Sequence, residues 1–195
     1  MYLQFENCLA GSRFQTSIYH KAMESHPDTQ LIVFPELAVT GYQCGENFKD
    51  LAETATIDST SIKKMSALAK EFHVHIVYGM AEKEEDILYN SQFFIDDTGV
   101  LLGTYRKVHL FDSEKNYFTP GDQFKVFNTK IGRIGLFICY DAFFPEAARS
   151  LAIQGVDLLV NSTNWEKPYD YDIAKQMKHD YYTMLTERRP DVYIA

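Results

Sequence analysis

The sequence predicts an α/β protein. Short apolar segments of strand length alternate with segments in which apolar residues recur at helical spacing, the pattern of a sheet covered by helices. The chain has 195 residues, of which 46% are hydrophobic and 14% aromatic. A chain of this size buries roughly 70% of the surface that it exposes when unfolded. We therefore expect one globular domain over residues 1–195, with no repeats and no low-complexity linkers.

The first third of the chain is predicted to form two strands and two helices. A short strand near Leu3–Phe5 precedes a helix that begins at about Phe14, and Leu31–Phe34 has the composition of a buried strand. The next helix begins after Ser59-Thr60-Ser61, which are good capping residues. Its apolar face consists of Ile62, Met65, Leu68 and Phe72.

The middle of the chain is predicted to be a strand followed by a hairpin. Val74–Met80 is rich in apolar and β-branched residues, which favours a strand. Two further strands, at about Gln92–Asp96 and at Val100–Lys107, are separated by the turn sequence Asp96-Asp97-Thr98-Gly99. These segments indicate antiparallel neighbours.

A second hairpin follows. Its arms are Phe124–Asn128 and Arg133–Cys139, joined by Thr129–Gly132. Pro145 suits the first turn of a helix, and Gly155 suits the position just after the end of that helix. Another strand is expected next.

The last part of the sequence predicts a strand at Val156–Asn161, a helix from about Asp170 to Glu187, and a fragment, Val192–Ala195, that still has the composition of a strand. Pro190 breaks the passage into that fragment. A sheet that stops there would expose a strand edge and apolar surface, both of which favour association. We therefore expect a homo-oligomer, a dimer or larger.

Charge and hydropathy exclude several partners. The net charge of −8 and the pI near 5.2 argue against nucleic acid and anionic membrane surfaces, which are bound mainly by clustered Lys and Arg. No apolar stretch approaches the roughly 20 residues of a membrane helix, and the start lacks a basic region followed by a long apolar one. We expect a soluble, cytoplasmic protein.

No metal and no cofactor are predicted. The three cysteines form no CxxC pair, and His73 and His75 have no acidic or Cys partner at ligand spacing. Gly132-Arg133-Ile134-Gly135 lacks the rest of a dinucleotide fingerprint and falls in a predicted hairpin turn.

Three reactive side chains stand at the ends of apolar strands. Glu36 follows Leu31–Pro35, Lys107 follows Leu101–Arg106, and Cys139 ends the run that begins at Gly135. Each has an ordinary structural explanation when taken alone: a cap or salt bridge for Glu36, a strand-end side chain reaching water for Lys107, a small buried hydrophobe for Cys139. Together, a carboxylate, an ammonium and a thiol suit cysteine-based acyl transfer.

The sequence motifs around these residues are more specific than any of the three residues alone. Phe34-Pro35-Glu36-Leu37, then Tyr105-Arg106-Lys107-Val108-His109, then Ile138-Cys139-Tyr140-Asp141 resembles the nitrilase, or carbon–nitrogen hydrolase, superfamily. All three signatures occur in the order of the family. The resemblance covers nearly the whole chain and implies a four-layer αββα sandwich, incomplete at the C-terminal end because family members normally continue past Val192–Ala195.

The resemblance also implies roles. It makes Glu36 the general base, Lys107 the cationic stabiliser, Cys139 the nucleophile and Glu114 a supporting carboxylate. On chemical grounds, Lys107 and the backbone N–H of Tyr140 are expected to hold the developing oxyanion. Tyr42, Asn164 and Trp165 follow strand ends on the expected rim and are candidates for the acyl pocket. Asp141, beside the nucleophile, is expected to be scaffolding for the turn.

Two functional hypotheses stay open at this point. The first is an amidase that hydrolyses small aliphatic, carbamoyl or ω-amide substrates through a cysteine thioester. The second is a catalytically silent, shortened subunit that acts by association. Nitrile hydrolysis and acyl transfer to another amine would use the same thioester, so the signatures do not separate them from amide hydrolysis.

Overall fold

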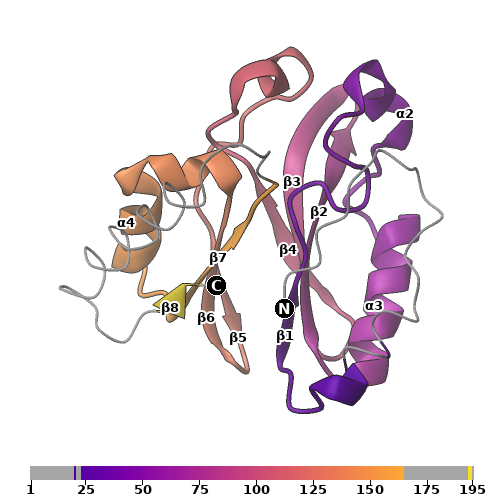
Figure 1. The fold of residues 1–195 in the computed structure, drawn as a ribbon, viewed down its shortest axis with the longest axis vertical. Coiled ribbons are helices and arrows are strands. Elements are labelled where there is room, and N and C mark those ends of the chain that lie inside the picture. The colour runs from indigo at the N-terminus through magenta and orange to yellow at the C-terminus, as the bar shows by residue number, and fades with distance from the viewer. Residues whose placement is uncertain (1–19, 21–22, 165–192, 195) are drawn as a thin grey trace.

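The computed structural model describes residue 20, residues 23–164 and residues 193–194. Two four-stranded sheets lie face to face, and each carries a helix on its outer side (Figure 1). The order of layers across the molecule is α4, the sheet β5-β6-β7-β8, the sheet β1-β2-β3-β4, and α3. The predicted αββα sandwich is therefore confirmed.

The first sheet contains β1 (Leu31–Val33), β2 (His75–Glu84), β3 (Ile87–Ile95) and β4 (Leu101–Arg106). β1 pairs with β2 in parallel, and the other neighbours are antiparallel. The predicted hairpin is β3–β4. Strands β2 and β3 are longer than the sequence predicted and also pair as a hairpin. Polar residues continue β2 beyond Met80 because they are paired: Glu82 is buried and accepts hydrogen bonds from Ser91 and Arg106.

Helix α3 (Thr60–Phe72) covers the outer face of this sheet. The predicted apolar face packs there, with Ile62 and Met65 against Ile76 and Tyr78 of β2. The start of the helix differs from the prediction. Ser59 makes no capping hydrogen bond. Instead the carboxylate of Glu53 accepts the backbone N–H of Ser61 at 2.9 Å, which satisfies one of the free donors of the first turn.

The second sheet contains β5 (Val126–Thr129), β6 (Gly132–Ile138), β7 (Leu158–Ser162) and β8 (Tyr193–Ile194). The predicted hairpin is β5–β6, and β7 and β8 add in parallel. Helix α4 (Pro145–Ile153) begins at Pro145 and ends before Gly155, as predicted. Its buried residues are Ala147, Ala148 and Leu151.

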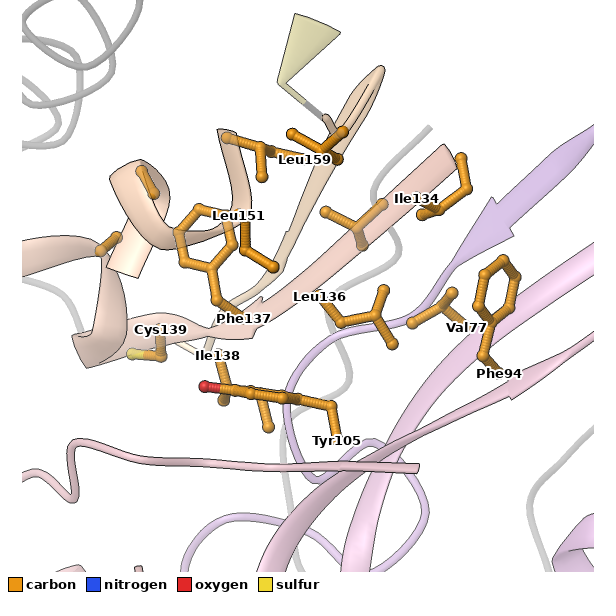
Figure 2. Close-up of a cluster of buried hydrophobic side chains, with 14 residues drawn as sticks. Val77, Phe94, Tyr105, Ile134, Leu136, Phe137, Ile138, Cys139, Leu151 and Leu159 are labelled. Atoms are coloured by element: carbon orange, nitrogen blue, oxygen red, sulfur yellow. The ribbon is translucent and has the colours of Figure 1, made fainter. Parts of the chain in front are cut away.

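The main core lies between the sheets and extends under α4 (Figure 2). Val77, Phe94 and Tyr105 of the first sheet meet Leu136 and Ile138 of the second. Successive residues of a strand point to opposite faces, so Val77 packs in this core while its neighbour Tyr78 packs under α3. Both faces of the first sheet are therefore buried.

Short helical segments complete the described chain: η1 (Gly45–Asn47), α2 (Phe48–Leu51), η2 (Asp112–Asn116) and η3 (Cys139–Phe143). The strand predicted near Leu3 and the helix predicted from Asp170 lie outside the described residues. Of the helix predicted from Phe14, the described residues, His20 and 23–25, are helical. Within the part of the chain that the structure describes, no helix has the length and apolarity needed to cross a bilayer.

Gly79 of β2 lets the segment that carries Glu36 lie directly on the sheet. A Cβ at this position would come within 2.5 Å of the backbone nitrogen of Leu37 and 2.9 Å of the carbonyl oxygen of Pro35. We expect Gly79→Ala to push that segment away, at a cost of about 1–3 kcal/mol. In a chain of this size, the melting temperature should fall by several degrees. An unchanged thermal melt would contradict the close contact.

Candidate active site

Glu36 is held in the interior by the segment that follows β1. Phe34 donates its backbone N–H to the carbonyl of Val77 at 2.8 Å, and Leu37 then takes a left-handed backbone conformation, with φ of 51°. This conformation is uncommon for residues other than glycine. The result is a carboxylate that is only 1% exposed, although carboxylates are seldom buried without partners.

The partner of Glu36 is Lys107. The Lys107 Nζ lies 2.7 Å from Oε1 of Glu36 and 2.9 Å from the carboxylate of Glu114. Lys107 follows β4 directly and is fully buried. One buried ammonium therefore stands between two buried carboxylates.

Glu114 reaches this ammonium from η2. Its Oε2 accepts the backbone N–H of Phe111 at 2.8 Å, which fixes the side chain at the start of the 3-10 turn. Asn90 of β3 donates its amide to Glu36 at 2.8 Å and to Glu114 at 3.3 Å. The two carboxylates are thus held by Asn90 as well as by Lys107.

Burial and charge act against each other in this cluster. Removal from water is the largest influence on Glu36 and raises its pKa from 4.5 to about 7; Lys107 opposes this rise and Glu114 adds to it. Burial alone would lower the pKa of Lys107, but the charges of Glu36, Cys139 and Glu114 raise it overall. At neutral pH the site therefore holds a fixed cation and a carboxyl group poised to exchange a proton.

Cys139 lies at the junction between β6 and η3. It is 5% exposed, and its φ of 44° is left-handed. Residues with a Cβ atom seldom adopt this conformation unless the surrounding structure imposes it, and such positions cluster at functional sites. Its charge acts on both Lys107 and Tyr42, so the thiol belongs to the same electrostatic cluster as the buried ammonium.

The other predicted residues are placed as follows. Asn164 donates its backbone N–H to Oε2 of Glu36 at 3.3 Å. Tyr42 is half-buried; burial, and then the charges of Glu36 and Glu114, raise its pKa. Tyr140 follows the thiol in η3. Trp165 lies outside the described residues.

A cavity of about 350 Å³ opens beside Glu114. Both apolar and polar residues line it. Its lining comprises Leu37, Tyr42, Gln43, Gly45, Phe48, Ser113, Glu114, Tyr117 and Phe118. Glu114 is one of the two buried carboxylates, so the cavity reaches the buried cluster. Tyr42, on which the charges of Glu36 and Glu114 act, also lines it. Among the described residues, no group of three or more His, Cys, Asp or Glu side chains could hold a metal ion.

Sequence reasoning missed Asn90. Asn90 belongs to a run of three polar residues, Asn90-Ser91-Gln92, in the middle of β3. The role of Asn90 depends on β3 lying next to β4, where Lys107 donates its backbone N–H to the carbonyl of Asn90 at 2.8 Å. His109 and Tyr105 were also not assigned, although both contact Asp141.

Comparison with known proteins identifies the family. The family model described as carbon-nitrogen hydrolase matches residues 15–183, which is most of the chain. The chain belongs to the carbon–nitrogen hydrolase family. The resemblance drawn from the three signatures is thereby confirmed.

Some relatives of this carbon–nitrogen hydrolase family member are named nitrilases, and others are named amidases. A protein named "Probable nitrilase" from Schizosaccharomyces pombe is 49% identical over 168 residues, covering 84% of this chain and 61% of the relative. An N-carbamoylputrescine amidase from Solanum tuberosum is 41% identical over 140 residues, covering 68% of this chain and 47% of the relative.

Among solved structures, Nit3 of Saccharomyces cerevisiae, a member of branch 10 of the nitrilase superfamily, is similar with a TM-score of 0.76 and 29% identity. The alignment covers 85% of this chain and 64% of that one. The chain thus spans between about half and two thirds of the length of these three proteins.

Proposed function

We propose that this chain hydrolyses the carbon–nitrogen bond of small amides through a thioester on Cys139. The observation that carries the proposal is the buried cluster in which Lys107 joins Glu36 and Glu114 beside a thiol in a left-handed backbone conformation. The relatives named as amidases support the same reaction class.

In the first half of the reaction, the Cys139 sulfur attacks the amide carbonyl and its proton passes to Glu36. An ordinary thiol, with a pKa of about 8.5, is mostly protonated at neutral pH and needs such a base. The carbon–sulfur bond forms, the carbon–nitrogen bond breaks, and Glu36 returns the proton to the departing nitrogen. Ammonia or an amine leaves, and the acyl group stays on sulfur.

Two donors would stabilise the oxyanion that forms during this attack. An ammonium has three N–H donors, of which Glu36 and Glu114 take two at Lys107. The third suits the substrate oxygen, together with the backbone N–H of Tyr140 in the first turn after the nucleophile. Donors already held in place cost no reorganisation during the reaction.

In the second half, water attacks the thioester. Glu36 takes a proton from this water, the carbon–sulfur bond breaks, and the thiol recovers its proton as the carboxylic acid leaves. Because Glu36 must accept a proton twice in each cycle, a pKa near neutrality suits it better than the ordinary value of a carboxyl group.

The cavity beside Glu114 points to a small substrate. Its volume of about 350 Å³ and its lining of both apolar and polar residues fit a short aliphatic, carbamoyl or ω-amide substrate, since small-molecule sites combine apolar contacts with polar groups that fix orientation. Tyr42 and Asn164 lie at the site and are proposed to line its substrate side, with Trp165 as the third candidate.

The test combines turnover with the reactivity of the thiol. Ammonia release from propionamide, a carbamoyl amine and an ω-amide is measured beside propionitrile, and acyl-enzyme is sought by mass spectrometry after acid quench. Iodoacetamide labelling of Cys139 is followed across pH. We expect the labelling rate to rise with a midpoint near pH 7, because below it Glu36 holds its own proton.

The matched variant is Glu36→Gln, which should remove the inflection near pH 7. If labelling of wild-type Cys139 follows an ordinary thiol, with a midpoint of about 8.5, and no amide or nitrile releases ammonia, the chain does not carry the proposed site. Turnover of the nitrile alone would reassign the substrate class and keep the thioester.

A further inference from the structure

Asp141 is fully buried, and its carboxylate accepts four hydrogen bonds. Oδ2 accepts the hydroxyl of Tyr105 at 2.7 Å and the backbone N–H of Ile138 at 2.9 Å. Oδ1 contacts His109 twice, at 2.8 Å from the backbone nitrogen and 2.9 Å from Nδ1. Because an ionised carboxylate only accepts, the His109 ring carries its proton on Nδ1.

The positions of these donors connect the two sheets. Tyr105 and His109 lie two residues before and two residues after Lys107, on the segment that leaves the first sheet. Asp141 lies two residues after Cys139, in the turn at the end of β6 in the second sheet. Figure 2 shows the Tyr105 side chain under the end of β6, with its hydroxyl toward the turn of Cys139.

The remaining contacts make this connection rigid. The His109 ring stacks on Phe144, with centroids 3.7 Å apart and an angle of 9° between the planes. Phe144 is the N-cap residue of α4, directly before Pro145. The backbone N–H of Ile138 meets Asp141 immediately before the left-handed Cys139. The same carboxylate therefore ties the strained turn to both sides of Lys107.

We propose, on the basis of the function above, that Asp141 is a positioning residue that sets the distance between the thiol of Cys139 and the ammonium of Lys107. The thiol and the ammonium come from different sheets, so their separation depends on how the sheets are held together. Apolar packing between sheets tolerates small shifts. A buried carboxylate that accepts four hydrogen bonds does not tolerate such shifts, because a shift leaves a donor without its acceptor.

Asp141→Asn is a sharp test because the amide cannot replace the carboxylate in either orientation. Each oxygen of Asp141 accepts a fixed backbone N–H, from Ile138 on one side and from His109 on the other. An amide NH₂ on either side would place two donors against each other. The substitution changes almost no volume, so its effect reports the hydrogen bonds.

Tyr105→Phe is the milder variant, and Tyr78→Phe is its control. Tyr105→Phe removes one of the four donors and leaves the carboxylate in place. Tyr78 is also a fully buried tyrosine of the first sheet, but it packs under α3 and away from the space between the sheets. Both substitutions remove one buried hydroxyl, and only one of them touches Asp141.

The readout is the rate of iodoacetamide labelling at Cys139, measured well below the melting temperature of every variant, together with kcat and KM for the amide that wild type turns over. We expect Asp141→Asn to lower labelling and kcat by about 10–10²-fold, since small displacements of reacting groups cost this much, with KM little changed. Tyr105→Phe should lower both several-fold, and Tyr78→Phe should leave both unchanged.

A double-mutant cycle separates positioning from general damage. If Asp141 acts by placing Lys107 against the thiol, Asp141→Asn should have little further effect on labelling in a Lys107→Met background. An equal effect in both backgrounds, or equal losses in Tyr105→Phe and Tyr78→Phe, would overturn the inference.

The two proposals fail in different ways. If wild-type Cys139 labels no faster than an ordinary thiol, the proposed function fails. If wild type is fast and Asp141→Asn is equally fast, only the positioning role fails. Should Asp141→Asn not fold, the comparison of Tyr105→Phe with Tyr78→Phe still decides.

Discussion

Replacing Cys139 by serine is expected to abolish hydrolysis, with a loss on the order of 10⁴-fold or more, as for the removal of other covalent nucleophiles. The change keeps the shape of the side chain in its tight turn. It replaces a thiol that Glu36 can deprotonate with a hydroxyl whose proton is far too tightly held for a base with a pKa of about 7. No acyl-enzyme should be found after acid quench.

The control is the fold and the substrate binding of the variant itself. Cys139→Ser should retain a thermal melt close to that of wild type and should still be stabilised by substrate. Residual turnover above one tenth of wild type would show that sulfur is not the nucleophile.

The sequence predicted where β1, β4 and β6 end to within about one residue, but not how far β2 continues. The charged or nucleophilic residue that closes each apolar segment is visible in the chain, which is why Glu36, Lys107 and Cys139 could be selected. The extension of β2 through Glu82 was not predictable, because a buried carboxylate within a strand is stable only when Ser91 and Arg106 pair with it. Those partners become neighbours only after β2, β3 and β4 have paired.

The same reason explains what was missed at the site. Asn90 reaches Glu36 across a separation of 54 residues, and Asp141 reaches Tyr105 across 36. Local patterns predict turns, caps and amphipathic faces, whereas a polar contact over such distances depends on the register of the strands. Asp141 was correctly expected to support the turn of Cys139, but nothing in the linear sequence indicated that it also holds the segment on both sides of Lys107.

Replacing Lys107 by methionine is expected to lower the rate of acylation by about 10²–10³-fold, the usual cost of losing one oxyanion donor. Methionine has nearly the volume of the lysine stem, so the cavity left behind is small. The measurement is single-turnover formation of acyl-enzyme, followed by mass spectrometry. Substrate affinity should change less than the rate, because the oxyanion exists only during the reaction.

Stability should change as well, in a direction that depends on pH. Without Lys107, the buried carboxylates of Glu36 and Glu114 lose the ammonium that pairs with both of them. The free energy of unfolding should then fall by about 3–5 kcal/mol when both are ionised. Loss of the ammonium removes the influence that holds the pKa of Glu36 down, so this pKa rises further above its value in the unfolded chain. A carboxyl group with a raised folded-state pKa stabilises the fold at low pH and loses that contribution as the pH rises. The deficit in melting temperature relative to wild type should therefore be small near pH 5 and large near pH 8.

A deficit that is equal at both pH values would mean that Lys107 does not balance the buried carboxylates. Near-normal acylation in Lys107→Met would remove Lys107 from the proposed mechanism.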